Sequence, residues 1–146
     1  TSAGTRGFQA TEISPDMATT LAVRGVPGAA RFRSRPFTED MIVHADVILT
    51  AETAHRQFVL DDHPAAFRKV FTLGQFADAV RALGPSLTGR DLLTVVAERR
   101  GTASPTLDIP DPYQQGPEVA EDCATTMERL LRIVVPALTG SGRTPA

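Results

Sequence analysis

The spacing of hydrophobic residues predicts two short buried strands joined by a helix. Residues 46–51 and 69–73 are short, almost continuously apolar runs that contain β-branched residues. Strands covered on both faces of a parallel sheet show such runs, so both segments are predicted to be buried strands. Residues 52–61 between them are predicted to be helical, which makes a strand–helix–strand unit.

Further helices are predicted where apolar residues recur every three or four positions or where a capping residue opens the run. The first begins at Ser14-Pro15-Asp16, with a polar N-cap, a proline in the first turn and an acid near the positive helix end. Pro27–Pro36 and Gly101–Gly116 are rich in helix-breaking residues and are predicted to be loops. The predicted helices cover residues 15–24, 38–44, 74–83, 90–100 and 118–138.

Alternation of strands and helices predicts one α/β domain. The 146 residues are 42% hydrophobic and 22% charged, which is typical of a single globular unit. Residues 1–138 are expected to form the domain. Residues 139–146 are rich in Gly, Ser, Thr and Pro and are expected to be a disordered tail.

Composition argues against several classes of partner and cofactor. The chain has no run near the ~18 apolar residues of a membrane span. A net charge of -2 without a dense Lys/Arg run gives little attraction for nucleic acid or a membrane surface. The scattered histidines His44, His55 and His63 and the single cysteine lack metal-ligand spacing, so no metal or cofactor is expected. One cysteine and no signal-peptide pattern predict a cytoplasmic protein.

Five short motifs follow one another along the chain. They are Thr1–Thr5 with its SAGT sequence, Ser14–Ala18, Phe32–Arg35, Ala45–Leu49 and Asp108–Tyr113 with its D-x-P-D-P-Y sequence. In this order they resemble motifs of the low-molecular-weight protein tyrosine phosphatase family, and the resemblance extends over nearly the whole chain. It implies a three-layer, flavodoxin-like, doubly wound parallel sheet, and the long segment at residues 74–100 resembles actinobacterial members.

The resemblance implies phosphomonoester hydrolysis in two steps, in which a cysteine thiolate attacks phosphorus and water then hydrolyses the phosphocysteine. Asp111 matches the family's general acid, which protonates the leaving oxygen. As an alternative, Asp111 is a turn former that caps local backbone. Asp108 is expected to be a loop carboxylate and is the second candidate acid. Tyr113 matches the aromatic residue that lines the substrate entrance, and burial within the loop is the alternative.

Two arginines and one glutamine near these motifs receive weaker interpretations. Arg33 and Arg35 could steer anionic substrates, but arginines in such a loop are more often solvated or paired with acids. Gln114 stands where some members of the family have a second tyrosine. Regulation through a pair of tyrosines, as in those members, is therefore not expected for this chain. None of the three histidines is assigned a role.

The catalytic nucleophile of the family lies in a C-x5-R-S loop after the first strand, and residues 1–146 contain no such loop. The C-x5-R spacing does occur at Cys123–Arg129, within the predicted C-terminal helix. Six helical steps separate these side chains by roughly 120°, and the intervening N–H groups are committed to helical hydrogen bonds. Cys123 is therefore predicted to be a packing residue. The first strand and first helix of the family's fold are expected to be absent, which leaves the domain incomplete at its N-terminus.

The favoured function is hydrolysis of phosphotyrosine in proteins or of small aryl phosphates. The first alternative is a non-catalytic pseudophosphatase, a module that binds a phosphorylated partner. Arsenate reduction is less favoured, because it needs resolving cysteines that are not visible in residues 1–122. The oligomeric state, monomer or homodimer, is left open by the sequence.

Overall fold

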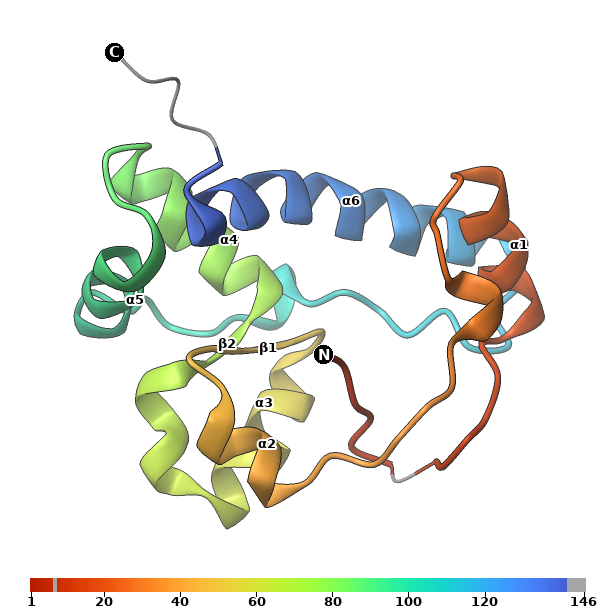
Figure 1. Ribbon diagram of the computed structural model, residues 1–146, viewed down its shortest axis with the longest axis horizontal. Coiled ribbons are helices and arrows are strands. Elements are labelled where there is room, and N and C mark those ends of the chain that lie inside the picture. The colour runs from red at the N-terminus through yellow and green to blue at the C-terminus, as the bar shows by residue number, and fades with distance from the viewer. Residues whose placement is uncertain (7, 142–146) are drawn as a thin grey trace.

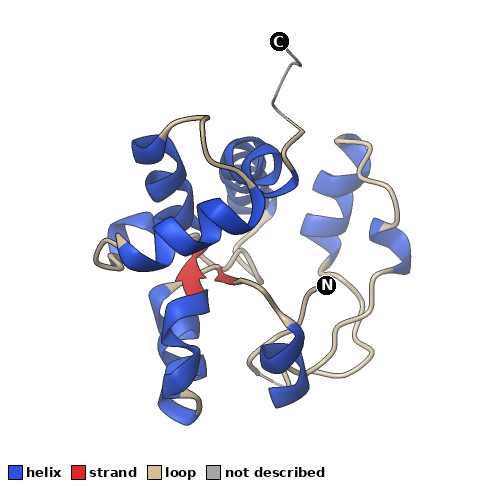
Figure 2. Cartoon of the chain, turned by 60° about the vertical axis from the view of Figure 1, so that its left-hand side comes forward, coloured by secondary structure: helices blue, strands red, loops and turns tan. Residues whose placement is uncertain are grey.

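Two short parallel strands lie between two layers of helices (Figure 1, Figure 2). Strand β1, Ile48–Thr50, pairs with β2, Val70–Thr72, and Leu49 lies opposite Phe71. In Figure 1, helices α1, α4 and α6 lie on one side of the strands, and α2 and α3 lie on the other. The predicted α/β class with a parallel sheet is therefore confirmed.

The computed structural model describes residues 1–6 and 8–141. Helix α3 and a 3-10 helix, η2, connect the two strands, and α4 follows β2 directly. The other elements in chain order are α1 (Pro15–Val23), η1 (Ala29–Arg31), α2 (Glu39–His44), α3 (Thr53–Asp62), η2 (Pro64–Lys69), α4 (Leu73–Leu83), α5 (Gly89–Glu98), η3 (Pro105–Leu107) and α6 (Pro117–Thr139).

The main core is built from β2 and the faces of α4, α5 and α6 that point toward the sheet. Phe71 on β2 and Phe76 on α4 are buried, and their rings meet edge to face with centroids 5.5 Å apart. Thr72 fixes the start of α4, because its Oγ1 accepts a hydrogen bond from the backbone N–H of Gln75. The core side chains from the remaining helices are Leu92, Val96, Cys123, Leu130 and Val134.

A smaller core lies on the opposite side of the sheet and holds α2 and α3 in place. Ile42 on α2 and Val59 on α3 pack with Ala66 and with Val70 of β2. The strand β2 therefore contributes to both cores. This explains why the segment 69–73 is a nearly uninterrupted apolar run.

Arg100 ties the end of the long segment 74–100 to the sheet. Its guanidinium carbon lies 4.2 Å from the ring centroid of Phe67 and 4.1 Å from that of Phe71. It also donates hydrogen bonds to the backbone carbonyls of Phe67 and Val70. Burial, together with the positive charge of Arg56, lowers the pKa of Arg100 to about 10.

Several element boundaries differ from the predictions. Both strands are shorter than the predicted segments 46–51 and 69–73, with three residues each. Ser14 and Thr38 occupy N-cap positions, but their side chains accept no hydrogen bond from the helices. Helix α6 includes Thr139, so the predicted tail 139–146 begins inside a helix, and its residues 142–146 lie outside the described part of the chain.

The N-terminal segment makes a single sheet-like contact in the structure. Gly4 forms an isolated parallel bridge with Pro36. The N–H of Gly4 bonds to the carbonyl of Arg35 at 2.9 Å, and the N–H of Phe37 bonds to the carbonyl of Gly4 at 3.0 Å. A strand is stabilised by pairing along its length. One bridge supplies too little of that pairing to order a longer strand.

Candidate functional site

Asp108 anchors the proline-rich loop to the carboxyl end of strand β1. Its Oδ1 accepts hydrogen bonds from both the backbone N–H and the Oγ1 hydroxyl of Thr53, each at 2.8 Å. The N–H of Ile109 donates to the carbonyl of Ala51 at 3.0 Å, and the Ile109 side chain is buried. The N-cap residue of α3, Glu52, makes no side-chain capping bond to this helix. Asp108 supplies that capping acceptor instead. In the structure, Asp108 therefore acts as a carboxylate that holds the loop, as the sequence predicts.

Asp111 lies at the turn that follows this anchor. Its Oδ1 accepts a hydrogen bond from the backbone N–H of Tyr113 at 3.0 Å, which is the local bond expected of a turn-forming aspartate. Gln115 donates from Nε2 to the backbone carbonyl of Asp111 at 2.8 Å, and Gln114 has a φ of 59°. These contacts leave the Asp111 Oδ2 atom without a partner among the described residues. The carboxyl group is held in place and is exposed to solvent.

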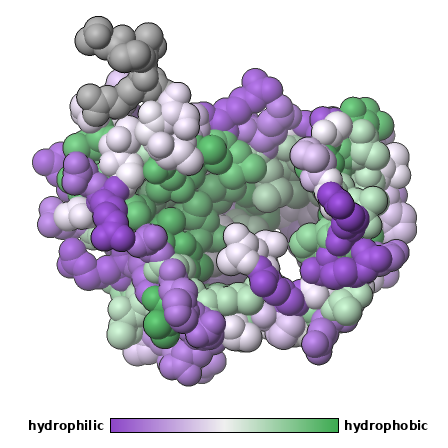
Figure 3. Space-filling view, in the orientation of Figure 1, coloured by the Kyte–Doolittle hydropathy of each residue, from purple (hydrophilic) through white to green (hydrophobic). Residues whose placement is uncertain are grey.

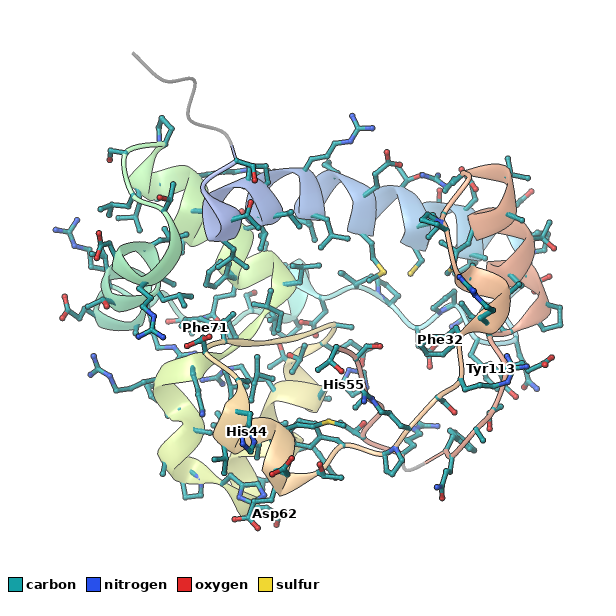
Figure 4. The ribbon with its side chains drawn as sticks, viewed as in Figure 1. Phe32, His44, His55, Asp62, Phe71 and Tyr113 are labelled. Atoms are coloured by element: carbon teal, nitrogen blue, oxygen red, sulfur yellow. The ribbon has the colours of Figure 1, made fainter. Side chains whose placement is uncertain are left out.

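Tyr113 is exposed, with 61% of its surface accessible. The alternative prediction, that it is buried within the loop, is therefore wrong. Gln114 Nε2 lies 3.4 Å from its hydroxyl oxygen. Figure 4 shows Tyr113 near the outer edge of the molecule, at the α1 side. Its ring can be reached by an incoming molecule.

Asp111 lines a cavity of about 1020 Å³ between helices α1 and α6. Ala51, directly after β1, and the loop residues Ile109 and Pro110 also line it. In the space-filling view, hydrophobic side chains gather in a hollow at the centre of the molecule (Figure 3). The side chains that α1 and α6 contribute are Met17, Leu21, Cys123, Ala124, Met127, Leu131 and Val135.

Cys123 lies in the wall of this cavity and is 8% exposed. Burial raises the pKa of its thiol, and the negative charge of Asp111 raises it further. A thiol in such surroundings is mainly protonated at neutral pH and is a poor nucleophile. Arg129 is exposed and is not part of the cavity lining, so the C-x5-R spacing brings no arginine to Cys123. Both observations support the prediction that Cys123 packs in the core.

Known structures of similar shape are phosphatases. YwlE arginine phosphatase from Geobacillus stearothermophilus superposes with a TM-score of 0.73 at 22% identity, over 100% of this chain and 79% of that one. The Erwinia amylovora tyrosine phosphatase AmsI gives a TM-score of 0.68 at 18% identity, over 94% of this chain and 72% of its own. The chain has the fold of the low-molecular-weight phosphatases.

A further YwlE structure with this phosphatase fold carries a phosphorylated serine in its active site. That serine replaces the cysteine at the seventh position of the YwlE chain, and the structure matches with a TM-score of 0.68 at 21% identity over 97% of this chain and 75% of that one. Because 79%, 75% and 72% of these phosphatase chains are covered, the remaining 21%, 25% and 28% have no counterpart in residues 1–146. No protein-family model and no curated protein matches the sequence.

Arg33 and Arg35, in the loop between η1 and α2, make structural contacts. Arg33 pairs with Glu12 at 2.8 Å and also donates to the carbonyl of Phe32 at 2.7 Å. Arg35 donates from Nε to the carbonyl of Ser2 at 2.7 Å. Neither arginine lines the cavity beside Asp111. The pair with Glu12 agrees with the prediction that Arg33 is paired with an acid, whereas Arg35 binds a backbone carbonyl instead.

Glu52 and His55 line the same cavity as Asp111, and neither residue was predicted to belong to the site. Both follow β1 closely, at the start of α3, so the sequence did contain a signal. Polar residues directly after a parallel strand lie at the sheet edge where α/β proteins bind ligands. Figure 4 shows His55 at the centre of the molecule, near the space between the two helical layers. The structure thus adds two ionisable groups to the neighbourhood of Asp111.

Removing the Asp108 carboxylate is expected to destabilise the fold. The Asp108→Ala variant leaves two donors of Thr53 without their acceptor, which is expected to cost about 1–2 kcal/mol in free energy of unfolding. Urea unfolding followed by circular dichroism measures this loss. Asp46→Ala is a matched control, because Asp46 is 72% exposed with its nearest basic partner at 3.9 Å. If both variants lower the free energy of unfolding equally, the hydrogen bonds from Thr53 to Asp108 make no specific contribution to stability.

Cys123 is expected to react slowly with iodoacetamide in the folded protein and quickly in urea. Because burial raises its pKa, the pH at which alkylation accelerates should lie above that of a free cysteine. Peptide mapping by mass spectrometry after timed labelling measures the rate at this residue. Rapid labelling of Cys123 at neutral pH in the folded protein would contradict the packing role.

Within residues 1–6 and 8–141, no group of three His, Cys, Asp or Glu side chains is placed to hold a metal ion. No helix among those residues is both long and apolar enough to cross a membrane.

Proposed function

We propose that residues 1–146 form most of a phosphatase of the low-molecular-weight tyrosine phosphatase family, with Asp111 as its general acid. The observation that carries the proposal is the position of Asp111, on a loop anchored at the carboxyl end of β1 and facing a cavity. Open α/β sheets bind ligands outside the carboxyl ends of their strands. The shared fold with three phosphatase structures supports the same assignment.

The proposed reaction transfers a phosphoryl group from an oxygen of the substrate to a cysteine thiolate. The bond between phosphorus and the leaving oxygen breaks, and Asp111 gives its proton to that oxygen. Water then attacks the phosphocysteine, and the Asp111 carboxylate takes up a proton from this water. The products are a phenol and inorganic phosphate, and both the thiolate and the acid are regenerated.

The thiolate of this reaction comes from outside residues 1–146. Cys123 is the only cysteine in those residues, and burial together with the Asp111 charge holds its pKa high. The structure in which YwlE is phosphorylated at its seventh position supports a nucleophile near the start of the polypeptide. We infer that such a residue lies in a segment that completes the sheet beside β1.

The proposed substrate is a phosphorylated tyrosine or a small aryl phosphate. The exposed ring of Tyr113 lies two residues from Asp111, where it can stack on an aromatic leaving group. One of the similar structures is named as an arginine phosphatase and another as a tyrosine phosphatase. Phosphoarginine is therefore the competing substrate to test.

The decisive assay uses the whole product of the gene that encodes residues 1–146. Its hydrolysis of an aryl phosphate, a phosphotyrosine peptide and a phosphoarginine peptide is measured at mildly acidic pH. We expect turnover of the first two. Faster turnover of the phosphoarginine peptide would correct the substrate class. Binding of the phosphopeptides without any turnover would favour a pseudophosphatase, and neither binding nor turnover would contradict the proposal.

A further inference from the structure

Two arginines meet at the half-exposed ring of Phe67, which lies in the 3-10 helix η2. The guanidinium carbon of Arg56 lies 5.4 Å from the centroid of this ring, and that of Arg100 lies 4.2 Å from it. Arg56 comes from α3 and Arg100 from the segment after α5, so the fold brings together two positive charges from distant parts of the chain. We call these two residues the arginine pair.

The arginine pair lies away from the cavity that Asp111 lines. Neither arginine lines that cavity, and Phe67 does not line it either. Arg100 also stacks on Phe71, with its guanidinium carbon 4.1 Å from the centroid of that ring. Figure 4 shows Phe71 and Tyr113 toward opposite sides of the molecule, and Tyr113 follows Asp111 by two residues. The pair is therefore separate from the proposed catalytic site.

No acidic side chain among the described residues compensates the two charges. Neither Arg56 nor Arg100 forms an ion pair with a described carboxylate. The acids of α3, Asp61 and Asp62, follow Arg56 by five and six residues, which places them on other faces of the helix, roughly 120–140° away. Glu52, one turn before Arg56, lines the Asp111 cavity instead.

The surroundings of the arginine pair disfavour its charge. Burial lowers the pKa of Arg56, and burial together with the charge of Arg56 lowers the pKa of Arg100 to about 10. The Nε atom of each arginine is enclosed by the protein and has no hydrogen-bond acceptor among the described residues. Buried donors without an acceptor are rare in native proteins, and an unseen ion is one explanation for them. A nearby anion would offset both effects.

Packing explains the position of Arg100 but gives Arg56 no role. Arg100 is fixed between two rings and donates hydrogen bonds to the backbone carbonyls of Phe67 and Val70. The side chain of Arg56 donates to no described acceptor, and of its three nitrogens only Nε is enclosed. Its two terminal nitrogens are therefore open to solvent. They can bind an oxyanion with two parallel hydrogen bonds, the geometry in which guanidinium groups bind phosphate.

We propose that Arg56 and Arg100 form a second anion site, which binds a phosphate group. Arg56 makes the direct contact, and Arg100 adds its charge from a fixed position. A phosphate monoester carries a charge of about -1.5 to -2 at neutral pH, which matches the two positive charges. A carboxylate would compensate only one of them. The group is either free inorganic phosphate or the phosphorylated side chain of another protein, and the site does not depend on Asp111.

Chemical modification of arginine in the whole gene product tests the site. Phenylglyoxal labels accessible guanidinium groups, and peptide mapping by mass spectrometry gives the rate at each arginine. We expect inorganic phosphate to slow the labelling of Arg56 in a saturable way, by about tenfold at a concentration about ten times the dissociation constant. Acetate at the same ionic strength should leave this rate nearly unchanged.

Arg90 is the control within the same labelling experiment. It begins the other end of α5, and its side chain is 91% exposed. Its labelling rate should be the same in phosphate and in acetate. The proposal is overturned if phosphate does not slow the labelling of Arg56, or if it slows Arg56 and Arg90 equally.

Thermal unfolding of a variant gives a second test. A bound anion raises the melting temperature of the protein that binds it. Phosphate bound near Asp111 would contribute equally in the unaltered protein and in Arg56→Gln, so the difference between them reports on the arginine pair. We expect phosphate to raise the melting temperature less in Arg56→Gln, and fully in Arg90→Gln. Equal rises in all three proteins would contradict the site, and the labelling of Arg56 decides alone if Arg56→Gln does not fold.

A peptide arm identifies the source of the phosphate group. A peptide that carries a phosphonate analogue of phosphotyrosine, which resists hydrolysis, is compared with inorganic phosphate in the protection of Arg56. Protection at lower peptide concentration assigns the site to phosphorylated proteins, and protection by phosphate alone assigns it to the free ion; both support the site. Protection of Arg56 should be unchanged in Asp111→Asn, so the site and the proposed function can fail separately.

Discussion

Replacing Asp111 by asparagine is expected to lower hydrolysis of phenyl phosphate by the whole gene product by about 10²–10⁴-fold. Asparagine offers the same oxygen to the Tyr113 N–H, so the turn is preserved. It cannot give a proton to the leaving oxygen. The loss should be smaller for p-nitrophenyl phosphate, because its leaving group depends less on protonation. Steady-state rates with both substrates measure the effect.

The control for Asp111→Asn is Asp78→Asn. Asp78 is an exposed residue of α4, and its ion pair with Arg81 at 2.9 Å is a surface pair of small energetic value. We expect its rates with both substrates to match those of the unaltered protein. Equal losses for the two leaving groups in Asp111→Asn would contradict a general acid and favour the alternative, in which Asp111 only forms the turn.

The Gly74→Ala variant is expected to be destabilised by about 2 kcal/mol or more in free energy of unfolding. Gly74 lies in the first turn of α4, where its Cα faces the loop that leads to Asp108. An added Cβ would come within 2.3 Å of the Leu107 carbonyl oxygen and 2.9 Å of its Cβ. Alanine in a helix normally stabilises it by about 1 kcal/mol relative to glycine, so the expected sign is the reverse of the intrinsic preference.

Gly101→Ala is the matched control for this variant. A Cβ at Gly101 meets nothing within 4 Å, and its backbone φ is outside the left-handed region. We expect its free energy of unfolding to change by no more than about 0.5 kcal/mol. Urea unfolding of both variants gives the comparison. A Gly74→Ala variant as stable as Gly101→Ala would mean that α4 and the loop can move apart freely.

The strand–helix–strand unit could be predicted from the sequence because its signals are local. The segments 46–51 and 69–73 are apolar since β1 and β2 are covered on both sides, and the structure confirms the pairing between them. The helices were found within a few residues of their observed bounds. Their ends were less accurate, because Ser14 and Thr38 suggested caps that their side chains do not form.

The position of the Asp111 loop could be predicted only in part. The D-x-P-D-P-Y motif pointed to Asp111 and Tyr113, and these assignments stay predictions. The bonds from Thr53 to Asp108 join residues 55 positions apart, so no local pattern could reveal them. Such contacts depend on how distant segments meet in the folded chain. The cavity that Asp111 lines was likewise visible only once α1 and α6 were placed together.

The contacts of Arg100 illustrate the same limit of local patterns. Arg100 is the last residue of the predicted helix 90–100, and the sequence around it indicates no aromatic partner. In the fold it lies between the rings of Phe67 and Phe71, which come from two elements more than 25 residues upstream. The stacking and the lowered pKa follow from that packing. The cytoplasmic location and the actinobacterial likeness stay predictions, and the choice between monomer and homodimer stays open.

Trapping the phosphorylated intermediate tests the central claim most directly. The whole gene product is mixed with an aryl phosphate, quenched in acid within the first turnover and digested for mass spectrometry. The account predicts one phosphoryl group on a cysteine outside residues 1–146, and its accumulation in Asp111→Asn should be slower. A phosphoryl group on Cys123, or turnover without any phosphocysteine, would contradict the account.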